Sequence, residues 1–302
     1  MRLLLAAALA VTLSASATAQ SGTFSQGSSS GQRISNTPPA ALSQPPTAHR
    51  HTSVSTLPVS GSTARRGATL RAPNGAWVYG ISLGERADNP CYLSLWWARL
   101  VDGDIHLGLS EFQRCNRGGP TNISLTSVGM NTVPSWDEYL ADLGGIPTVD
   151  GLGQARYVYP LALISTPGFA VLHPVETYQN IGAMFNGGTP RYPIFHRGDD
   201  LTALKSLQVC HNDNNQEMKG LSVRGVTVDL QRRPNARTRP IRRSNGQWDT
   251  DGAYRPNCDD RQPVRACPNQ QVIVGTTIRF DPGTNAKIKG LAPICAALTA
   301  AS

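Results

Sequence analysis

Short runs in which apolar and polar residues alternate dominate the chain from residue 72 onwards. Residues 77–83, 92–100 and 105–112 have this pattern, which is typical of half-buried β-strands. An Asp-Gly pair at 102–103 separates the second run from the third and predicts a two-residue hairpin turn. The 29 Gly and 22 Pro residues supply further turns between short strands. The pattern predicts a mainly β fold, built as an antiparallel β domain.

A unit of strand, polar turn and second strand recurs along the chain. In two copies the second strand begins with an apolar residue followed by Lys-Gly-Leu, and a third copy is more degenerate. The copies lie at 207–221, 278–291 and 80–95. Repeated hairpins with short strands predict radial, prism-like packing, with a sandwich as the alternative.

The last hairpin resembles a known family. The segment contains two motifs, Gly275-x-x-Ile278 and Ile288-x-Gly290-Leu291-x-x-x-Cys295. In these hairpin features it resembles the vitelline membrane outer layer protein family, whose members are secreted, disulfide-bonded β-prisms of three pseudo-repeated sheets. The resemblance covers the two terminal β regions and leaves out the centre of the chain. It implies association with carbohydrate or extracellular matrix, and it transfers no catalytic residue.

Residues 129–200 interrupt the β pattern. The sequence Ser-Trp-Asp-Glu at 135–138 is a capping box and predicts the start of a helix, which Gly144 and Gly145 would end. We therefore expect one short helix within a long central insertion, or within a lobe packed on the β domain 72–302.

The first 71 residues carry export and spacer signals. Residues 1–19 read as a signal peptide, with a basic start, an apolar core and a small-x-small cleavage motif before Gln20. Residues 20–71 are rich in Ser, Thr, Gly, Pro and Gln and predict a disordered tether. No later apolar run reaches the roughly 18–20 residues of a membrane helix. We expect a secreted or periplasmic protein, or one at the bacterial cell surface.

Cysteine usage agrees with export. Six Cys in an oxidising compartment predict three disulfides. Counting outward from the Asp-Gly turn places Cys91 opposite Arg114, and a single bulge would bring the next residue, Cys115, against Cys91. Of the other possible pairings, those between sequence neighbours are favoured: Cys210 with Cys258 and Cys267 with Cys295.

The positive charge is unevenly distributed. The formal charge is +8, and residues 1–71 contribute six Arg and no acid, which leaves +2 for residues 72–302. This balance does not favour nucleic acid as a partner. Residues 224–243 nevertheless hold seven Arg and one Asp, and could bind phosphate or carboxylate groups. In an exported protein the anion would be lipopolysaccharide, an acidic polysaccharide or extracellular DNA, and a solvated loop is the alternative. The candidate residues are Arg232, Arg233, Arg242 and Arg243.

A second candidate site follows this segment. Asp249 and Asp251 alternate on a tight turn, as carboxylates do in calcium loops, and Asp259 and Asp260 could complete the oxygen shell. Trp248 offers a stacking face for a sugar ring. Calcium is the one cofactor that the sequence raises, and a solvated Asp-Gly turn is the alternative interpretation.

A polar turn at 211–215 gives a third candidate. Asn212 and Asp213 could hydrogen-bond a sugar or an ion, or could simply form an Asx turn between two strands.

Signals for catalysis are weak. Ser82 lies in a Gly-x-Ser-x-Gly match, but a nucleophile elbow needs a helix after the Ser, and a loop and a strand follow here. No pair of carboxylates stands out as an acid/base couple. The leading prediction is an exported, non-catalytic protein that binds envelope or extracellular glycan or another anionic polymer. The alternatives are a glycan-active hydrolase or transferase, and a structural surface-layer protein.

Overall fold

The computed structural model describes residues 49–301, apart from 65, 87–88, 102–103, 116–125, 134–145, 150–154, 159–190, 198–199, 215, 231–234 and 283–286. Over these residues the regular secondary structure consists of β-strands, and the pairings are antiparallel. The predicted mainly β, antiparallel, disulfide-bonded fold is confirmed. The helix expected after residue 135 lies outside the described residues. No helix in the described part is long and apolar enough to span a membrane.

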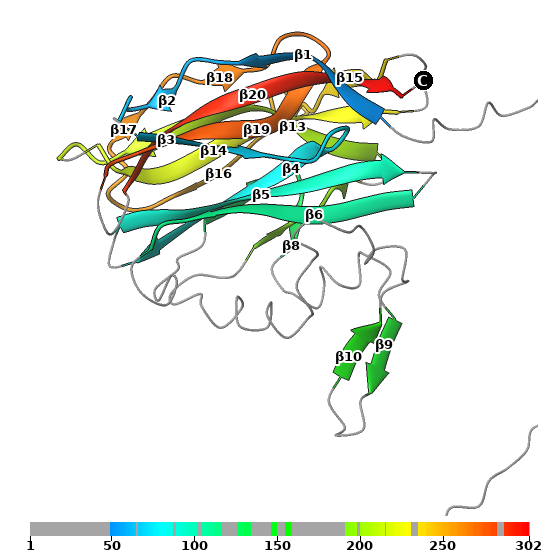
Figure 1. Ribbon diagram of the computed structural model, residues 1–302, viewed down its shortest axis with the longest axis horizontal. Helices are drawn as coiled ribbons and strands as arrows, with labels where there is room; N and C mark the ends of the chain where they lie inside the picture. Colours follow the sequence, from blue (N-terminus) through cyan, green and yellow to red (C-terminus); the bar gives the residue numbers. More distant parts are fainter. Residues whose placement is uncertain are drawn as a thin grey trace, which may run out of the picture. The chain divides into compact units, whose positions relative to one another are not determined.

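Three larger sheets make up the fold (Figure 1). Sheet I has the order β6-β5-β4-β7 and contains β4 (Trp77–Arg86), β5 (Asn89–Val101), β6 (Asp104–Gln113) and β7 (Thr126–Gly129). Sheet II has the order β1-β20-β19-β3, with β2 also on β20, and contains β1 (His49–Thr56), β2 (Ser60–Gly61), β3 (Arg66–Arg71), β19 (Gln271–Phe280) and β20 (Ile288–Ala300).

Sheet III is centred on the hairpin of β13 (Asp200–His211) and β14 (Met218–Asp229). Three short strands pair with β13: β12 (His196–Arg197), β17 (Asp260–Arg261) and β18 (Arg265–Ala266). Two pair with β14: β15 (Arg237–Pro240) and β16 (Thr250–Tyr254). Two separate short pairs join β8 (Thr132–Val133) to β11 (Tyr192–Pro193), and β9 (Ile146–Val149) to β10 (Ala155–Val158).

The central hairpins of the three sheets carry the same two irregularities. In each first strand one residue is left out of the pairing, namely Tyr79, Lys205 and Val274. In each second strand another is left out, namely Cys91, Lys219 and Lys289. Because the two bulges fall at matching positions in all three hairpins, the hairpins are structural repeats. The repeat predicted from the sequence is confirmed.

The hydrophobic core lies among the three sheets. Each hairpin contributes one directly opposed apolar pair at the same repeat position: Leu83 with Leu93, Val209 with Leu221, and Ile278 with Leu291. All six side chains are at most 2% exposed and belong to one cluster. Burying each contributes roughly 1.5–3 kcal/mol, so these pairs favour association of the three sheets around one core.

The segment 49–71 corrects one prediction. It was expected within a disordered tether, but it forms β1, β2 and β3, which pair with β19 and β20. The reason is that strands at a sheet edge can be held by backbone hydrogen bonds even when few of their side chains are apolar. Leu57, Ala68 and Leu70 add partly buried contacts with the core. Residues 20–48 lie outside the described residues, as does the signal segment.

All three predicted disulfides are present, joining Cys91 to Cys115, Cys210 to Cys258, and Cys267 to Cys295. The predicted register is confirmed, because the N–H of Arg114 donates to the carbonyl of Cys91 at 2.9 Å. The expected bulge before Cys115 is absent. The pairing of β5 with β6 is regular, and the chain simply leaves the ladder after Gln113.

Candidate functional site

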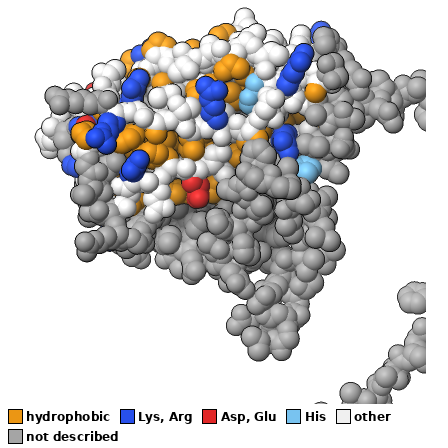
Figure 2. Space-filling view, viewed as in Figure 1, with side chains coloured by type: hydrophobic (Ala, Val, Ile, Leu, Met, Phe, Trp, Pro, Cys, Tyr) orange, Lys and Arg blue, Asp and Glu red, His pale blue; other side chains and the backbone are white. Residues whose placement is uncertain are grey.

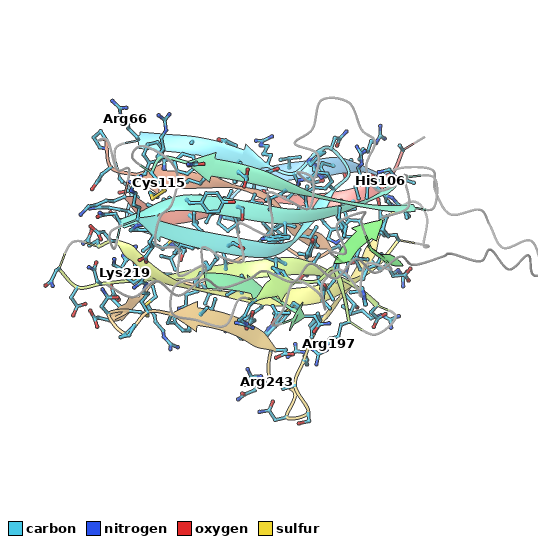
Figure 3. The ribbon with its side chains drawn as sticks, turned by 90° about the horizontal axis from the view of Figure 1, so that it is seen from below. Arg66, His106, Cys115, Arg197, Lys219 and Arg243 are labelled. Atoms are coloured by element: carbon cyan, nitrogen blue, oxygen red, sulfur yellow. A yellow bond between two sulfur atoms is a disulfide. The ribbon has the colours of Figure 1, made fainter. Side chains whose placement is uncertain are left out.

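A short hairpin follows β15 and carries residues of two of the predicted candidate sites. Arg242 and Trp248 face each other across a β-bridge, and the N–H of Asp249 donates to the carbonyl of Ile241 at 3.0 Å. At the tip, Gly246 has a φ of +78°, a conformation that favours glycine. The tip extends beyond the sheet near Arg243 (Figure 3). This geometry gives Arg243 and Trp248 fixed positions at one edge of sheet III.

Asp249 holds two arginines that come from different strands and loops. Its Oδ2 accepts from Arg197 Nη1 at 2.6 Å, and its Oδ1 accepts from Arg243 Nε at 3.3 Å. Hydrogen bonding from Arg197, with a smaller contribution from Arg243, lowers the pKa of Asp249, which keeps the carboxylate ionised. We call Arg197, Asp249 and Arg243 the arginine clamp.

Both arginines of the clamp keep donors for a ligand. Their side chains are 49% and 54% exposed, and Arg243 spends one further N–H on the carbonyl of Thr250 at 3.3 Å. A guanidinium carries five N–H donors, so each arginine retains several donors beyond these described hydrogen bonds. The clamp therefore carries two positive charges and one negative charge. Its carboxylate holds both guanidinium groups in position before an anion binds.

Trp248 is the aromatic neighbour of the clamp. It is partly buried and packs against the second apolar cluster, which includes Val226 and Val228 of β14. The guanidinium of Arg242 lies 5.2 Å from the centroid of the Trp248 ring. A sugar could stack on this ring only where Arg242 leaves it open, so Trp248 and Arg242 form one composite surface.

Asp251 connects two sheets. Its Oδ2 accepts from the N–H of Gly129 on β7 at 2.9 Å, and its Oδ1 accepts from Arg191 Nη2 at 2.8 Å. Arg191 also donates to Thr132 Oγ1 at 2.9 Å. Asp251 therefore links sheet III to the segment around β7. Both of its carboxylate oxygens accept hydrogen bonds within the protein, so it does not offer a free carboxylate to a ligand.

The candidate calcium site does not fit this geometry. The oxygens of Asp249 and Asp251 accept hydrogen bonds from arginines and a backbone N–H, which are groups that repel a cation. Asp259 and Asp260 lie next to β13, on the other side of the hairpin, and contact Asp213 and Gln262. Over the described ranges no group of three or more His, Cys, Asp or Glu side chains is arranged to hold a metal ion.

Asn212 closes the turn between β13 and β14. Its Oδ1 accepts from the N–H of Glu217 at 2.9 Å, while its own N–H donates to the carbonyl of Glu217 at 3.1 Å. Asp213 is exposed beside it. Since Thr250, the residue after Asp249, lies opposite Arg224 in the middle of β14, about 20 Å of strand separates this turn from the clamp. Asn212 therefore closes the turn across five positions, which differs from the predicted Asx turn, where the side chain bonds the N–H two residues on.

The arginine-rich segment is divided in two by the fold. Arg237 and Arg239 lie on β15, and Arg242 and Arg243 lie in the hairpin that follows. Arg232 and Arg233 lie outside the described residues. In the view of Figure 2, lysines and arginines are spread over the described face and do not form one patch.

Sequence reasoning missed Arg197 and Arg191. Each meets its aspartate across more than fifty positions, 52 for Arg197 and 60 for Arg191, and no local pattern reports such a contact. The weak signal was the Arg-Gly-Asp triplet that begins at Arg197, which reads as an ordinary polar turn.

Ser82 lies inside β4 and is 1% exposed, and its Oγ accepts from Trp96 Nε1 at 2.8 Å. The interpretation of Ser82 as a strand residue is confirmed.

No protein family and no curated protein matches this sequence. Among solved structures, the crystal structure of Calystegia sepium agglutinin matches at 9% sequence identity. The match covers 83% of this chain and 97% of that chain, with a TM-score of 0.30. Likeness at this level does not bear on what this chain binds, and the relation to the vitelline membrane outer layer family stays a prediction.

Proposed function

We propose that this chain is an exported, non-catalytic binding protein that holds an acidic saccharide at the arginine clamp. The observation that carries the proposal is the bridging of Arg197 and Arg243 by Asp249, with both arginine side chains about half exposed. Free arginine side chains lose conformational freedom when they bind an anion. Here the aspartate has already restricted both, so less freedom remains to be lost on binding.

The chemistry of the clamp favours a carboxylate or sulfate on a sugar. Guanidinium groups recognise such planar or multi-oxygen anions through paired N–H donors. Trp248 lies beside the clamp with Arg242 over its ring, and this surface can contact the apolar face of a sugar next to the acid group. The three disulfides suit the oxidising environment in which acidic polysaccharides and lipopolysaccharide are found.

Asp249→Asn provides a sharp test, measured by titration calorimetry with trigalacturonate. The substitution removes a negative charge, so simple charge counting predicts tighter binding of the anion. The clamp predicts the opposite, because Arg197 and Arg243 lose the acceptor that positions them. We expect about tenfold weaker binding, equal to about 1.4 kcal/mol.

Asp281→Asn is the matched control, since Asp281 follows β19 and pairs with Lys289 at 2.8 Å, away from the clamp. It should leave the affinity unchanged or slightly raised. A neutral trisaccharide such as cellotriose should bind the wild-type chain more weakly than trigalacturonate. Tighter trigalacturonate binding by Asp249→Asn would show that the Asp249 carboxylate only repels the anionic ligand. That result would contradict the proposal.

A further inference from the structure

The outer face of β15 continues the positive surface of the clamp. In the strand register Arg239 lies opposite Thr227 and Arg237 lies opposite Asp229, whereas Thr238 lies opposite the buried Val228. Directly opposed residues point to the same side of a sheet, so the two arginines point to the face of β15 opposite to that of Thr238, which we call its outer face. Both are exposed.

The same face leads to the hairpin. Arg242 lies over Trp248, on the side of Val226 and Val228, so it belongs to the opposite face; Arg243 of the clamp follows it directly. Six residues of extended chain separate Arg237 from Arg243, a reach of about 20 Å. Residues 224–251 contain seven Arg and three Asp, a local balance of +4. Arg237, Arg239 and Arg243 thus span a length greater than one sugar residue needs.

The free edge of β15 is closed to another strand. The N–H of Thr238 donates to Gln270 Oε1 at 2.8 Å, and Gln270 Nε2 donates back to the carbonyl of Thr238 at 3.5 Å. The amide of Gln270 occupies the backbone groups that a pairing strand would use. A partner that adds a β-strand here is therefore disfavoured. A ligand at this edge must bind the arginine side chains and not the backbone.

We infer that the ligand is a linear polyanion, of the polyuronate class, whose chain extends from the clamp along the outer face of β15. This inference rests on the proposed function and adds the shape of the ligand. Arg197 and Arg243 hold one acid group, and Arg239 and Arg237 contact acid groups further along the same chain. Binding neutralises several charges in a row, so it is stronger for long chains and sensitive to salt.

The test compares trigalacturonate with decagalacturonate in the wild-type chain and in the double variant Arg237→Ser, Arg239→Ser. A decamer offers more registers than a trimer, but this statistical gain is the same for both proteins. We expect the double variant to bind the decamer about tenfold more weakly, with a shallower salt dependence, while its affinity for the trimer stays within about twofold. The double variant Arg66→Ser, Arg71→Ser on β3, where both residues are also exposed, is the matched control and should match the wild type.

The outcomes separate the two proposals. If the wild-type chain does not bind the trimer, the clamp hypothesis fails. If the trimer binds, but the β15 variant keeps full affinity for the decamer, the clamp hypothesis stands and the extended ligand is refuted. If single-stranded DNA of matched charge binds more tightly than decagalacturonate and depends on Arg237 and Arg239, the saccharide class is overturned in favour of nucleic acid.

Discussion

Lys219 and Lys289 occupy the same position in two of the three hairpins, where each is the extra residue of the second bulge. Their surroundings differ. Lys219 is fully buried and lies 3.4 Å from a carboxylate oxygen of Glu217, which also contacts Lys287. Lys289 is 17% exposed and pairs with Asp281. In the third hairpin the position is Cys91, which is held by a disulfide. The same bulge is thus fixed in three chemical ways.

The buried pair makes a prediction about stability. Lys219→Met leaves the buried Glu217 with one of its two described lysine partners, so the free energy of unfolding should fall by about 3 kcal/mol. Adding Glu217→Gln removes the buried charge that has lost one of its lysine partners, and should restore part of the loss. Urea denaturation of the two single variants and the double variant measures this coupling.

Lys289→Met is the control for this cycle. Its partner Asp281 is 40% exposed, so the loss should stay below about 1 kcal/mol. Equal losses for Lys219→Met and Lys289→Met would contradict the view that burial makes the Glu217 pair sensitive.

The repeat could be read from the sequence because it depends on local order. Each copy has a polar turn between two strands, and the alternation of apolar residues predicts those strands directly. The Asp-Gly turn predicts the register of the neighbouring hairpin, β5 with β6. The strands β1 and β3 could not be read in this way. They are polar, and their partners Ala300 and Phe280 lie more than two hundred positions away. Composition describes how much apolar surface a segment has. It does not report whether the backbone of that segment pairs with a strand far away in the sequence.

The site was predictable only in part, for the same reason. Trp248, Asp249 and Arg243 are close in sequence, and their chemistry was recognisable. The role of Asp249 was misjudged, because the arginine that makes it an acceptor for guanidinium groups lies 52 positions earlier. Without that contact, two alternating aspartates look like cation ligands.

The N-terminal strands should be essential for stability. A chain that begins at Ala72 lacks β1 to β3, and with them Ser60, whose Oγ donates to the carbonyl of Pro263 and accepts from the N–H of Val209. We expect its melting temperature to lie roughly 10 °C or more below that of a chain that begins at His49. Calorimetry of the two chains decides the matter, and equal melting temperatures would mean that 49–71 is dispensable.

The disulfides should contribute according to the loops that they close. Removing the Cys91–Cys115 bond, which spans 24 residues, with paired Ser substitutions should cost about 3 kcal/mol. Removing Cys210–Cys258, which spans 48 residues, should cost about 0.6 kcal/mol more. Denaturation under non-reducing conditions gives both values. A larger loss for the shorter loop would point to contacts of Cys91 in the folded state as the main contribution.

A buried histidine, His211, and a half-buried one, His51, should make the fold sensitive to mild acid. Burial lowers the pKa of His211 below its ordinary value, against the opposing effects of the Lys289 carbonyl, which accepts from Nε2 at 2.6 Å, and of Asp260. Burial also lowers the pKa of His51, although its ring contacts the carbonyl of Ala76. In both cases the neutral imidazole is the form that the folded chain prefers.

The sign of the pH dependence follows from these directions. The unfolded chain takes up protons at about pH 6.5, before the folded chain does. Stability is therefore complete above that pH, falls as the pH decreases, and levels off once the folded-state pKa has been passed. Each histidine can contribute a slope of up to about 1.4 kcal/mol per pH unit. His211→Gln should reduce the slope measured by urea denaturation between pH 7.5 and 5.5. A folded-state NMR titration that placed either histidine above pH 6.5 would contradict this account.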